Sequence, residues 1–134
     1  MKLLLDTHVL LWLFTNDSRL SDEARAMIGS SQNELYYSVA SVWEVGIKYT
    51  IKPSGMPISD EDFVAYCDRS GIKMLGIVPE HIFMLKSLKR EKDAPIHKDP
   101  FDRLLIAQAK CEGMNFLTHD KLLPYYKEEC IVLV

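Results

Sequence analysis

Short apolar segments alternate with amphipathic helical segments along this chain. The apolar segments have the composition of buried strands, and they lie at 2–5, 34–39, 73–78, 115–119 and 130–134. Strands that alternate with helices form a parallel sheet, because a parallel connection needs a crossover long enough to hold a helix. The chain is therefore predicted to fold as an α/β domain whose central parallel sheet, of about five strands, is covered by helices.

The helices carry their own boundary signals. Ser21 and Ser59 stand at N-cap positions with acids in the turns that follow. Asp99 is also at an N-cap position, with Pro100 as the first residue of its helix. Gly113 follows the last helical residue of the Asp99 segment. These signals predict helices at about 7–14, 21–29, 41–52, 59–70, 79–88 and 99–112.

Length and composition indicate one domain that spans residues 1–134. With 134 residues, 48% of them hydrophobic, the chain is long enough to bury a sizeable core. The apolar N-terminal stretch is interrupted by Asp6 and His8, which suits a strand followed by a helix and not a leader or a membrane span. Cys67, Cys111 and Cys130 lack CxxC spacing, so we expect reduced, structural thiols. We expect a cytoplasmic protein with no membrane association.

Four carboxylates lie close behind apolar runs. Asp6 follows LLL, Glu44 lies in SVWEVG, Asp102 lies in DPFDRLLIAQA, and Asp120 ends FLTHD. Residues just past parallel strands, and in the first turns of the next helices, converge at the carboxyl edge of the sheet. Clustered acids raise each other's pKa or need a cation between them. The four acids therefore predict a divalent metal site and metal-assisted phosphate chemistry.

Several of these acids also have an ordinary structural alternative. Asp6 can cap the helix that follows it. Glu44 can form an ion pair with Lys48, four residues further along a helix. Asp120 has Lys121 beside it as a rival partner. We favour the ligand role for Glu44, because burial of its charge without a cation would be unfavourable.

Three neighbouring side chains are expected to support the acids. Asp99 fits the cap of the helix that carries Asp102, and it can also support the site or bind a second metal. Thr118 lies two residues before Asp120, where its hydroxyl can bond a carboxylate or a metal-bound water. The planar guanidinium of Arg103 can orient an acid or hold a phosphate, and a surface salt bridge is its ordinary alternative.

A basic segment precedes the Asp99 helix. Although the net charge of the chain is −3, residues 86–98 carry five Lys or Arg against two acids. We expect Lys89, Arg90, Lys92 and Lys98 to contact the phosphate backbone of a nucleic acid. A solvated helix end and loop is the alternative interpretation.

Histidines and aromatic residues are left out of the predicted metal site. His8, His97 and His119 lie near the acids in the sequence, but no HxxxH or HxxEH spacing is present. The aromatic residues are expected in the core or at interfaces and not as base-stacking platforms; they are Trp12, Tyr36, Tyr37, Trp43, Tyr125 and Tyr126.

Four motifs in order, LLLDTHVLLW, SVASVWEVGIK, HKDPFDRLLIAQA and NFLTHD, resemble those of the PIN domain. The likeness is specifically to the VapC-like ribonuclease toxins of bacterial toxin–antitoxin pairs, and it runs from Met1 to about Asp120. It implies a three-layer α/β/α fold with an acidic site for Mg²⁺ or Mn²⁺. Asp6, Glu44, Asp102 and Asp120 match the acidic quartet of the family, and Thr118 matches a hydroxyl often found beside the last acid.

The resemblance also implies an activity and partners. The activity is metal-dependent hydrolysis of RNA phosphodiester bonds by a toxin, and the partner is a small VapB-like antitoxin that places a basic or bulky side chain in the acidic site. A homodimer is implied as well, for which helices near 21–28 and 59–66 can supply the interface. Two alternatives remain open: a PIN-fold nuclease acting on DNA or structured nucleic acid, and a non-catalytic binding module. A phosphatase with an aspartyl nucleophile is less favoured, because no second Asp follows Asp6 at two residues.

Overall fold

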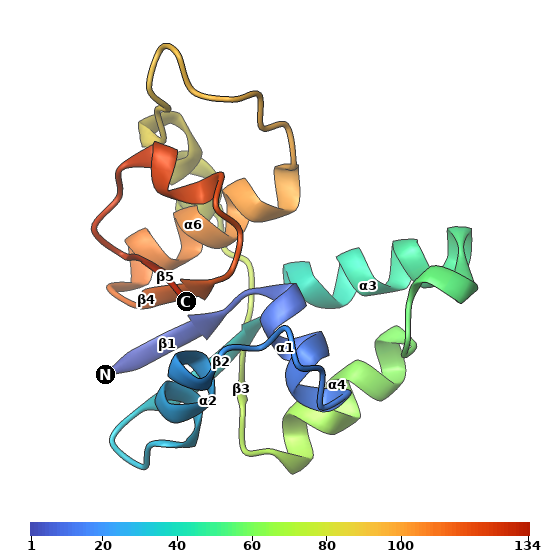
Figure 1. Ribbon diagram of the computed structural model, residues 1–134. Helices are drawn as coiled ribbons and strands as arrows, with labels where there is room; N and C mark the ends of the chain where they lie inside the picture. Colours follow the sequence, from blue (N-terminus) through green and yellow to red (C-terminus); the bar gives the residue numbers. More distant parts are fainter.

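Five parallel strands form the central sheet in the order β3-β2-β1-β4-β5 (Figure 1). The computed structural model describes residues 1–134. The strands are β1 (Lys2–Leu5), β2 (Glu34–Ser38), β3 (Lys73–Leu75), β4 (Asn115–Thr118) and β5 (Ile131–Leu133). Leu4 of β1 pairs with Tyr36 of β2 on one side and with Phe116 of β4 on the other. The predicted parallel sheet is confirmed, and its strand order changes direction between β1 and β4.

Six α-helices connect or follow the strands. They are α1 (Thr7–Phe14), α2 (Asp22–Gly29), α3 (Val39–Ile51), α4 (Asp60–Arg69), α5 (Pro79–Met84) and α6 (Pro100–Glu112). Short 3-10 turns occur at η1 (Pro53–Gly55), η2 (Leu85–Ser87) and η3 (Leu123–Tyr126). The predicted helices are confirmed within a few residues, whereas η3 was not predicted. None of the helices combines the length and the apolar character that crossing a bilayer requires.

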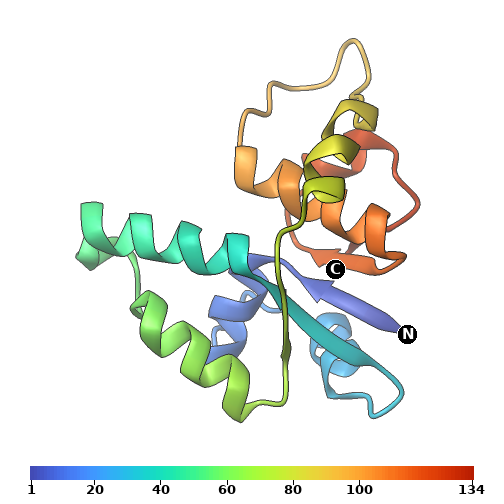
Figure 2. The same ribbon diagram turned by 180° about the vertical axis from the view of Figure 1, so that it is seen from behind.

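Two apolar cores cover the two faces of the sheet. Alternate residues of β1 divide between them: Leu3 and Leu5 pack in the core shared with α1, α2 and α4, and Leu4 packs in the core shared with α6. Figures 1 and 2 show the resulting layers, with α1, α2 and α4 on one side of the sheet and α5 and α6 on the other. Each fully buried leucine contributes about 1.5–3 kcal/mol through the hydrophobic effect. The three-layer α/β/α architecture is confirmed.

The apolar side chains of α2 and α4 point into the molecule's own core. Ala24, Phe63 and Cys67 are fully buried there, so these three side chains cannot contribute to the interface expected at 21–28 and 59–66. Tyr66 of α4 is 37% exposed, and apolar side chains with greater exposure lie on other elements. Trp43 is 61% exposed on α3, and Phe83 is 60% exposed on α5.

Candidate active site

A cavity of about 230 Å³ lies at the carboxyl ends of β1 and β4, where the strand order changes direction. Ligand sites of open α/β sheets form at this position, because the connections on the two sides lead away from each other and leave a crevice. The cavity is lined by Asp6, His8, Trp12, Asp99, Asp102, His119 and Asp120. Three of the four predicted metal ligands and the predicted supporting acid, Asp99, therefore share one cavity.

Asp6 follows β1 and is held by two hydrogen bonds. Its Oδ1 accepts from the backbone N–H of Thr7 at 2.7 Å, which makes it the N-cap of α1, and its Oδ2 accepts from the Thr118 hydroxyl at 2.6 Å. The same Thr118 oxygen accepts from the backbone N–H of Asp120 at 3.1 Å. Burial raises the pKa of Asp6 to about 7; the Thr118 hydroxyl opposes the rise, and the nearby charge of Glu44 adds to it.

Asp102 enters the cavity from the first turn of α6. Asp99 caps this helix, because its Oδ1 accepts from the backbone N–H of Phe101 at 2.9 Å and from that of Asp102 at 3.3 Å. The pKa of Asp102 is raised to about 8, mainly by burial and in addition by the nearby charges of Asp6 and Asp99. The capping role and the position at the cavity are therefore both present in the DPFDR segment.

Glu44 stands beside the cavity and does not line it. Its Oε2 lies 2.6 Å from the Nζ of Lys48, so the ion pair that the sequence offered as an alternative is formed. Its Oε1 accepts from the Thr7 hydroxyl at 2.8 Å. The carboxylate is close enough for its charge to raise the pKa of both Asp6 and Asp102, but in this arrangement its own charge is balanced by a lysine.

The residues present fit a divalent cation. No Lys or Arg forms an ion pair with Asp6, Asp99, Asp102 or Asp120. Several carboxylates in one cavity therefore repel each other without a compensating cation, and the raised pKa values of Asp6 and Asp102 are in part the consequence. Carboxylate oxygens are the donors that Mg²⁺ and Mn²⁺ prefer.

His97 lies at the site although it lacks a sequence spacing typical of metal ligands. Its Nε2 is 3.1 Å from the Oδ2 of Asp102, and its Nδ1 is 2.8 Å from the hydroxyl of Tyr126. Burial lowers the pKa of His97, which favours the neutral ring. One signal was available in the sequence, since His97 stands two residues before Asp99 in the HKDPFDR motif.

His8 and His119 lie with Trp12 at the aromatic rim of the cavity. Trp12 is half-buried and lies between His8 and His119, with ring centroids 6.0 Å and 5.1 Å away. The guanidinium of Arg19 lies 5.1 Å from the centre of the Trp12 ring. These contacts place Trp12 at the cavity as well as against the core, which its sequence position alone did not indicate.

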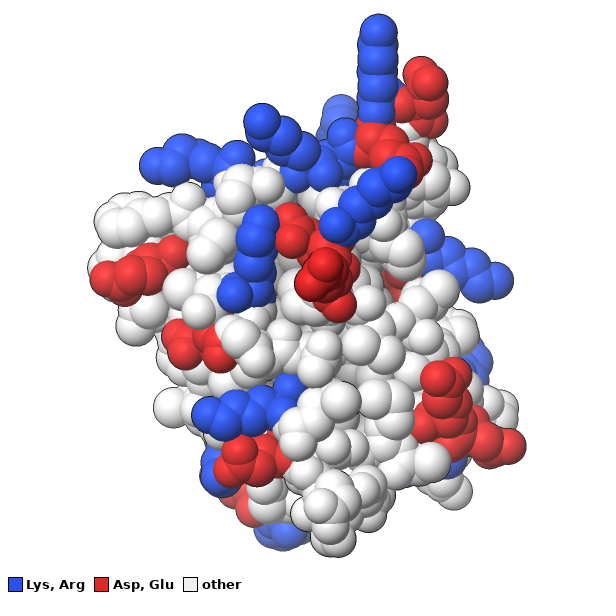
Figure 3. All heavy atoms as spheres, turned by 90° about the vertical axis from the view of Figure 1, so that its left-hand side faces the viewer, with Lys and Arg blue, Asp and Glu red and all other residues white.

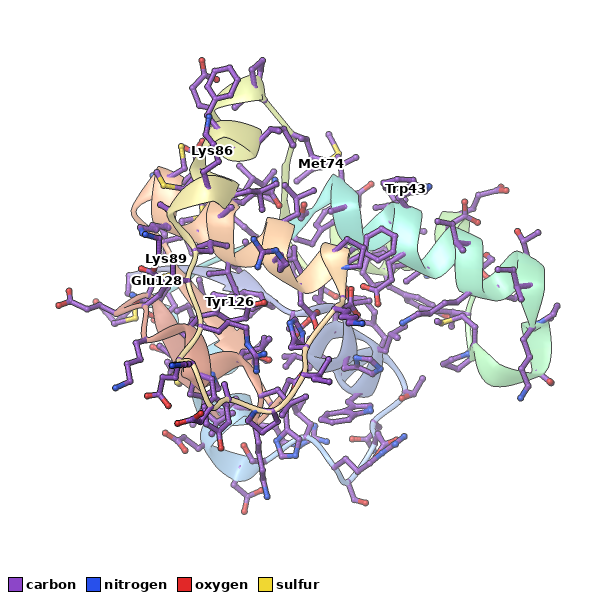
Figure 4. The ribbon with its side chains drawn as sticks, turned by 90° about the horizontal axis from the view of Figure 1, so that it is seen from above. Trp43, Met74, Lys86, Lys89, Tyr126 and Glu128 are labelled. Carbon is purple, nitrogen blue, oxygen red and sulfur yellow. The ribbon has the colours of Figure 1, made fainter.

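The basic segment reaches the site only at its end. The beginning of the segment lies on the side of the molecule where Lys110 bonds the Ser87 hydroxyl and Glu128, and Figure 4 labels Lys86, Lys89 and Glu128 on this side. Lys110 lies eight residues after Asp102 on α6, or about 12 Å along the axis at 1.5 Å per residue. Figure 3 shows that this side mixes basic with acidic side chains. Lys98 is exposed and adjoins the cavity residue Asp99, so it is the best placed of the predicted phosphate contacts.

Two predicted arginine contacts turn away from the acids. The guanidinium of Arg90 lies over the rings of Tyr125 and Tyr126, at 6.0 Å and 5.4 Å from their centres, and its Nε and Nη2 are buried without a partner. Arg103 lies 5.8 Å from the Tyr126 ring and donates to the Leu85 carbonyl at 3.4 Å. Neither arginine bonds an acid of the cavity, so the role predicted for Arg103 as a partner of these acids is not seen.

Comparisons with known proteins agree with this architecture. The family model of the PIN domain matches residues 3–128. A structure of VapBC2 from Rickettsia felis bound to a DNA fragment from their promoter is similar with a TM-score of 0.68, at 12% identity over 100% of this chain and 98% of that chain. A structure of VapBC-1 from nontypeable Haemophilus influenzae has a TM-score of 0.65, at 16% identity over 99% and 98%. No curated protein sequence matches significantly. The chain belongs to the PIN domain family.

Proposed function

We propose that this protein is a Mg²⁺- or Mn²⁺-dependent endoribonuclease and acts as the toxin of a toxin–antitoxin pair. The proposal rests on one observation: four acids line one cavity, at the edge of the sheet where the strand order changes direction. They are Asp6, Asp99, Asp102 and Asp120. Membership of the PIN domain family supports it, as does the likeness in fold to two VapBC structures.

Asp6, Asp102 and Asp120 would hold the cation. When bound, a divalent cation supplies charge neutralisation at a scissile phosphate and activation of a water molecule. The chain itself keeps the donors in place: the Thr7 N–H and the Thr118 hydroxyl each hold one oxygen of Asp6, and the same hydroxyl holds the turn that presents Asp120. These hydrogen bonds also favour the ionised form of Asp6, which is the form that binds a cation.

The substrate class proposed is single-stranded RNA. Lys98 would meet its phosphates beside the cavity, and Lys92, exposed on the same loop, would extend this contact. Such contacts weaken with salt, because each one releases condensed counterions. Cleavage should therefore slow as the salt concentration rises.

Cleavage of defined substrates tests the activity. The protein is stripped with EDTA, supplied with Mg²⁺ or Mn²⁺, and given single-stranded RNA, single-stranded DNA and a flap substrate of the same sequence. We expect RNA to be cut, with 5′-phosphate and 3′-hydroxyl ends, and Asp6→Asn or Asp120→Asn to abolish cutting. Asp93→Asn, at an exposed acid of the loop, is the matched control. Wild-type rates in either site variant would refute the mechanism.

The substrate panel also separates the two alternatives. Cleavage of DNA or of the flap without cleavage of RNA would favour the nuclease for DNA or structured nucleic acid. Binding of RNA without cleavage under any metal would favour the non-catalytic module.

The partner proposed is a small VapB-like antitoxin. An arginine of the antitoxin placed in the cavity would pair with the carboxylates and compete with the cation. The test is co-expression with the product of a small neighbouring reading frame, followed by cleavage and metal-binding assays on the complex. The complex should neither cut RNA nor bind Mn²⁺ as the free protein does; a product that leaves both unchanged is not the antitoxin.

A homodimer is also proposed. Figure 4 shows Trp43 on the outer side of α3, where an open apolar groove also contains Ile47 and Ile51. Met74 and Phe83, each 60% exposed, belong to a second region around β3 and α5. Exposed apolar groups of this kind are typical of protein interfaces. Sedimentation of the protein as a monomer at micromolar concentration would remove this proposal.

A further inference from the structure

His97 brings a nitrogen donor to the group of acids. It lies at the end of the loop of residues 88–99, the long connection that rises at the top of Figure 1 and leads into α6. Its side chain is only 4% exposed. One potential ligand atom from each of His97, Asp102 and Asp120 can be chosen so that all three lie within 4.8 Å of one another. Three donors at such separations can share one ion.

The orientation of the His97 ring leaves Nε2 directed at the acids. Its other nitrogen, Nδ1, lies 2.8 Å from the hydroxyl of Tyr126, which is 2% exposed. When Nδ1–H donates to this hydroxyl, the Nε2 atom carries a lone pair. Imidazoles that bind metals are usually held in this way, because a hydrogen bond at one nitrogen fixes the tautomer and the direction of the other.

Tyr126 itself packs against two arginines, Arg90 of the basic segment and Arg103 of α6. The guanidinium groups of Arg90 and Arg103 lie 5.4 Å and 5.8 Å from the centre of its ring. Because both guanidinium groups pack against the Tyr126 ring, neither forms an ion pair with the acids of the cavity. It also makes Tyr126 a rigid support for the imidazole, since cation–π contacts and burial restrict the ring.

We propose that His97 binds the divalent cation of this site through Nε2, together with Asp102 and Asp120, and that Tyr126 is the positioning residue. The inference rests on the proposed metal-dependent function and adds a ligand to it. Imidazole nitrogen suits Mn²⁺, Co²⁺ or Zn²⁺ better than Mg²⁺, which prefers oxygen. The site therefore favours a transition metal over Mg²⁺. The rival role for His97 is a hydrogen bond from Nε2–H to Asp102, which metal binding would displace.

Electron spin-echo spectroscopy of bound Mn²⁺ distinguishes the two roles without any mutation. A directly bound imidazole nitrogen modulates the Mn²⁺ echo, and the modulation changes when the protein is labelled with ¹⁵N-histidine. We expect this change in the wild-type protein. Mn²⁺ binding without nitrogen modulation would overturn the inference and leave the proposed nuclease intact. Absence of Mn²⁺ binding alone would also overturn the inference, and absence of both Mn²⁺ and Mg²⁺ binding would overturn the proposed nuclease as well.

Variants then assign the signal to a residue. His97→Ala should remove the nitrogen modulation and weaken Mn²⁺ binding by about tenfold or more, with a smaller effect on Mg²⁺, both measured by titration calorimetry. His119→Ala is the matched control, because His119 lines the same cavity but is not in the three-donor group. Tyr126→Phe should keep the modulation and weaken Mn²⁺ binding. Modulation that persists in His97→Ala, or that is lost in His119→Ala, would contradict the assignment.

Discussion

Replacement of Asp6 by asparagine should stabilise the metal-free protein at high pH. Asp6 is 4% exposed, and its pKa rises from the ordinary value of 3.8 to about 7 in the fold. Between these two values the unfolded chain has lost the proton and the folded chain still holds it. The free energy of unfolding therefore falls as the pH rises from about 4 to 7, and it levels off above that range.

The size of the effect follows from the shift. Each pKa unit corresponds to about 1.4 kcal/mol, so the shift of Asp6 opposes folding by up to about 4 kcal/mol at pH 8. An asparagine side chain cannot ionise, so Asp6→Asn should gain roughly this amount over wild type at pH 8 and almost nothing at pH 4. This gain is an upper value, because asparagine has one side-chain oxygen and cannot accept from both the Thr7 N–H and the Thr118 hydroxyl, as Asp6 does.

Urea denaturation in EDTA at pH 4, 6 and 8 measures this difference. The exposed variant Asp93→Asn should show no comparable pH-dependent gain. Addition of Mn²⁺ at 100 times its dissociation constant should stabilise the wild type by about 2.7 kcal/mol and Asp6→Asn by less. An advantage of Asp6→Asn that is the same at pH 4 and pH 8 would refute the reasoning, because it would show that ionisation of Asp6 is not the source.

Contacts around the cavity and at the end of α6 give three further expectations. In EDTA, Thr118→Val should extend the fall in the free energy of unfolding to higher pH, because the hydroxyl that lowers the pKa of Asp6 is gone. An unchanged midpoint of this pH dependence would count against the role of the hydroxyl. Lys48→Met should lower the free energy of unfolding by about 1–3 kcal/mol in urea denaturation, since it leaves the buried Glu44 without its ion-pair partner; an unchanged value would show that the pair adds nothing to stability. Gly113→Ala should lower the free energy of unfolding by about 1 kcal/mol in thermal denaturation, because Gly113 ends α6 at φ 67°, where a side chain is strained. No loss would mean that the backbone at the end of α6 relaxes to another conformation.

Local sequence patterns predicted the helices and strands. The position of the acids just after the strands predicted most of the site. Caps such as Ser21 and Asp99 fix helix starts through bonds to nearby backbone groups, so their effect can be inferred from a few residues. Asp6 and Asp120 could be placed at one edge because each closely follows a strand, and parallel strands end together.

The remainder depends on contacts between distant segments. His97 reaches Asp102 because the loop of residues 88–99 folds back over Tyr126, which lies 29 residues further along the chain. The turn η3, which places Tyr126, shows no regular apolar period that would predict it. Glu44 could pair with Lys48 or face the cavity, and only the packing of α3 determines which contact forms.

The pairing of β1 with β4 joins the beginning of the chain to a segment near its end. The Thr118 hydroxyl meets Asp6 across 112 residues of sequence. A chain that is still being synthesised therefore cannot assemble the acidic cavity before β4 has left the ribosome. Contacts between segments so far apart in the sequence form late in folding, because the long stretch of chain between them must first be closed into a loop.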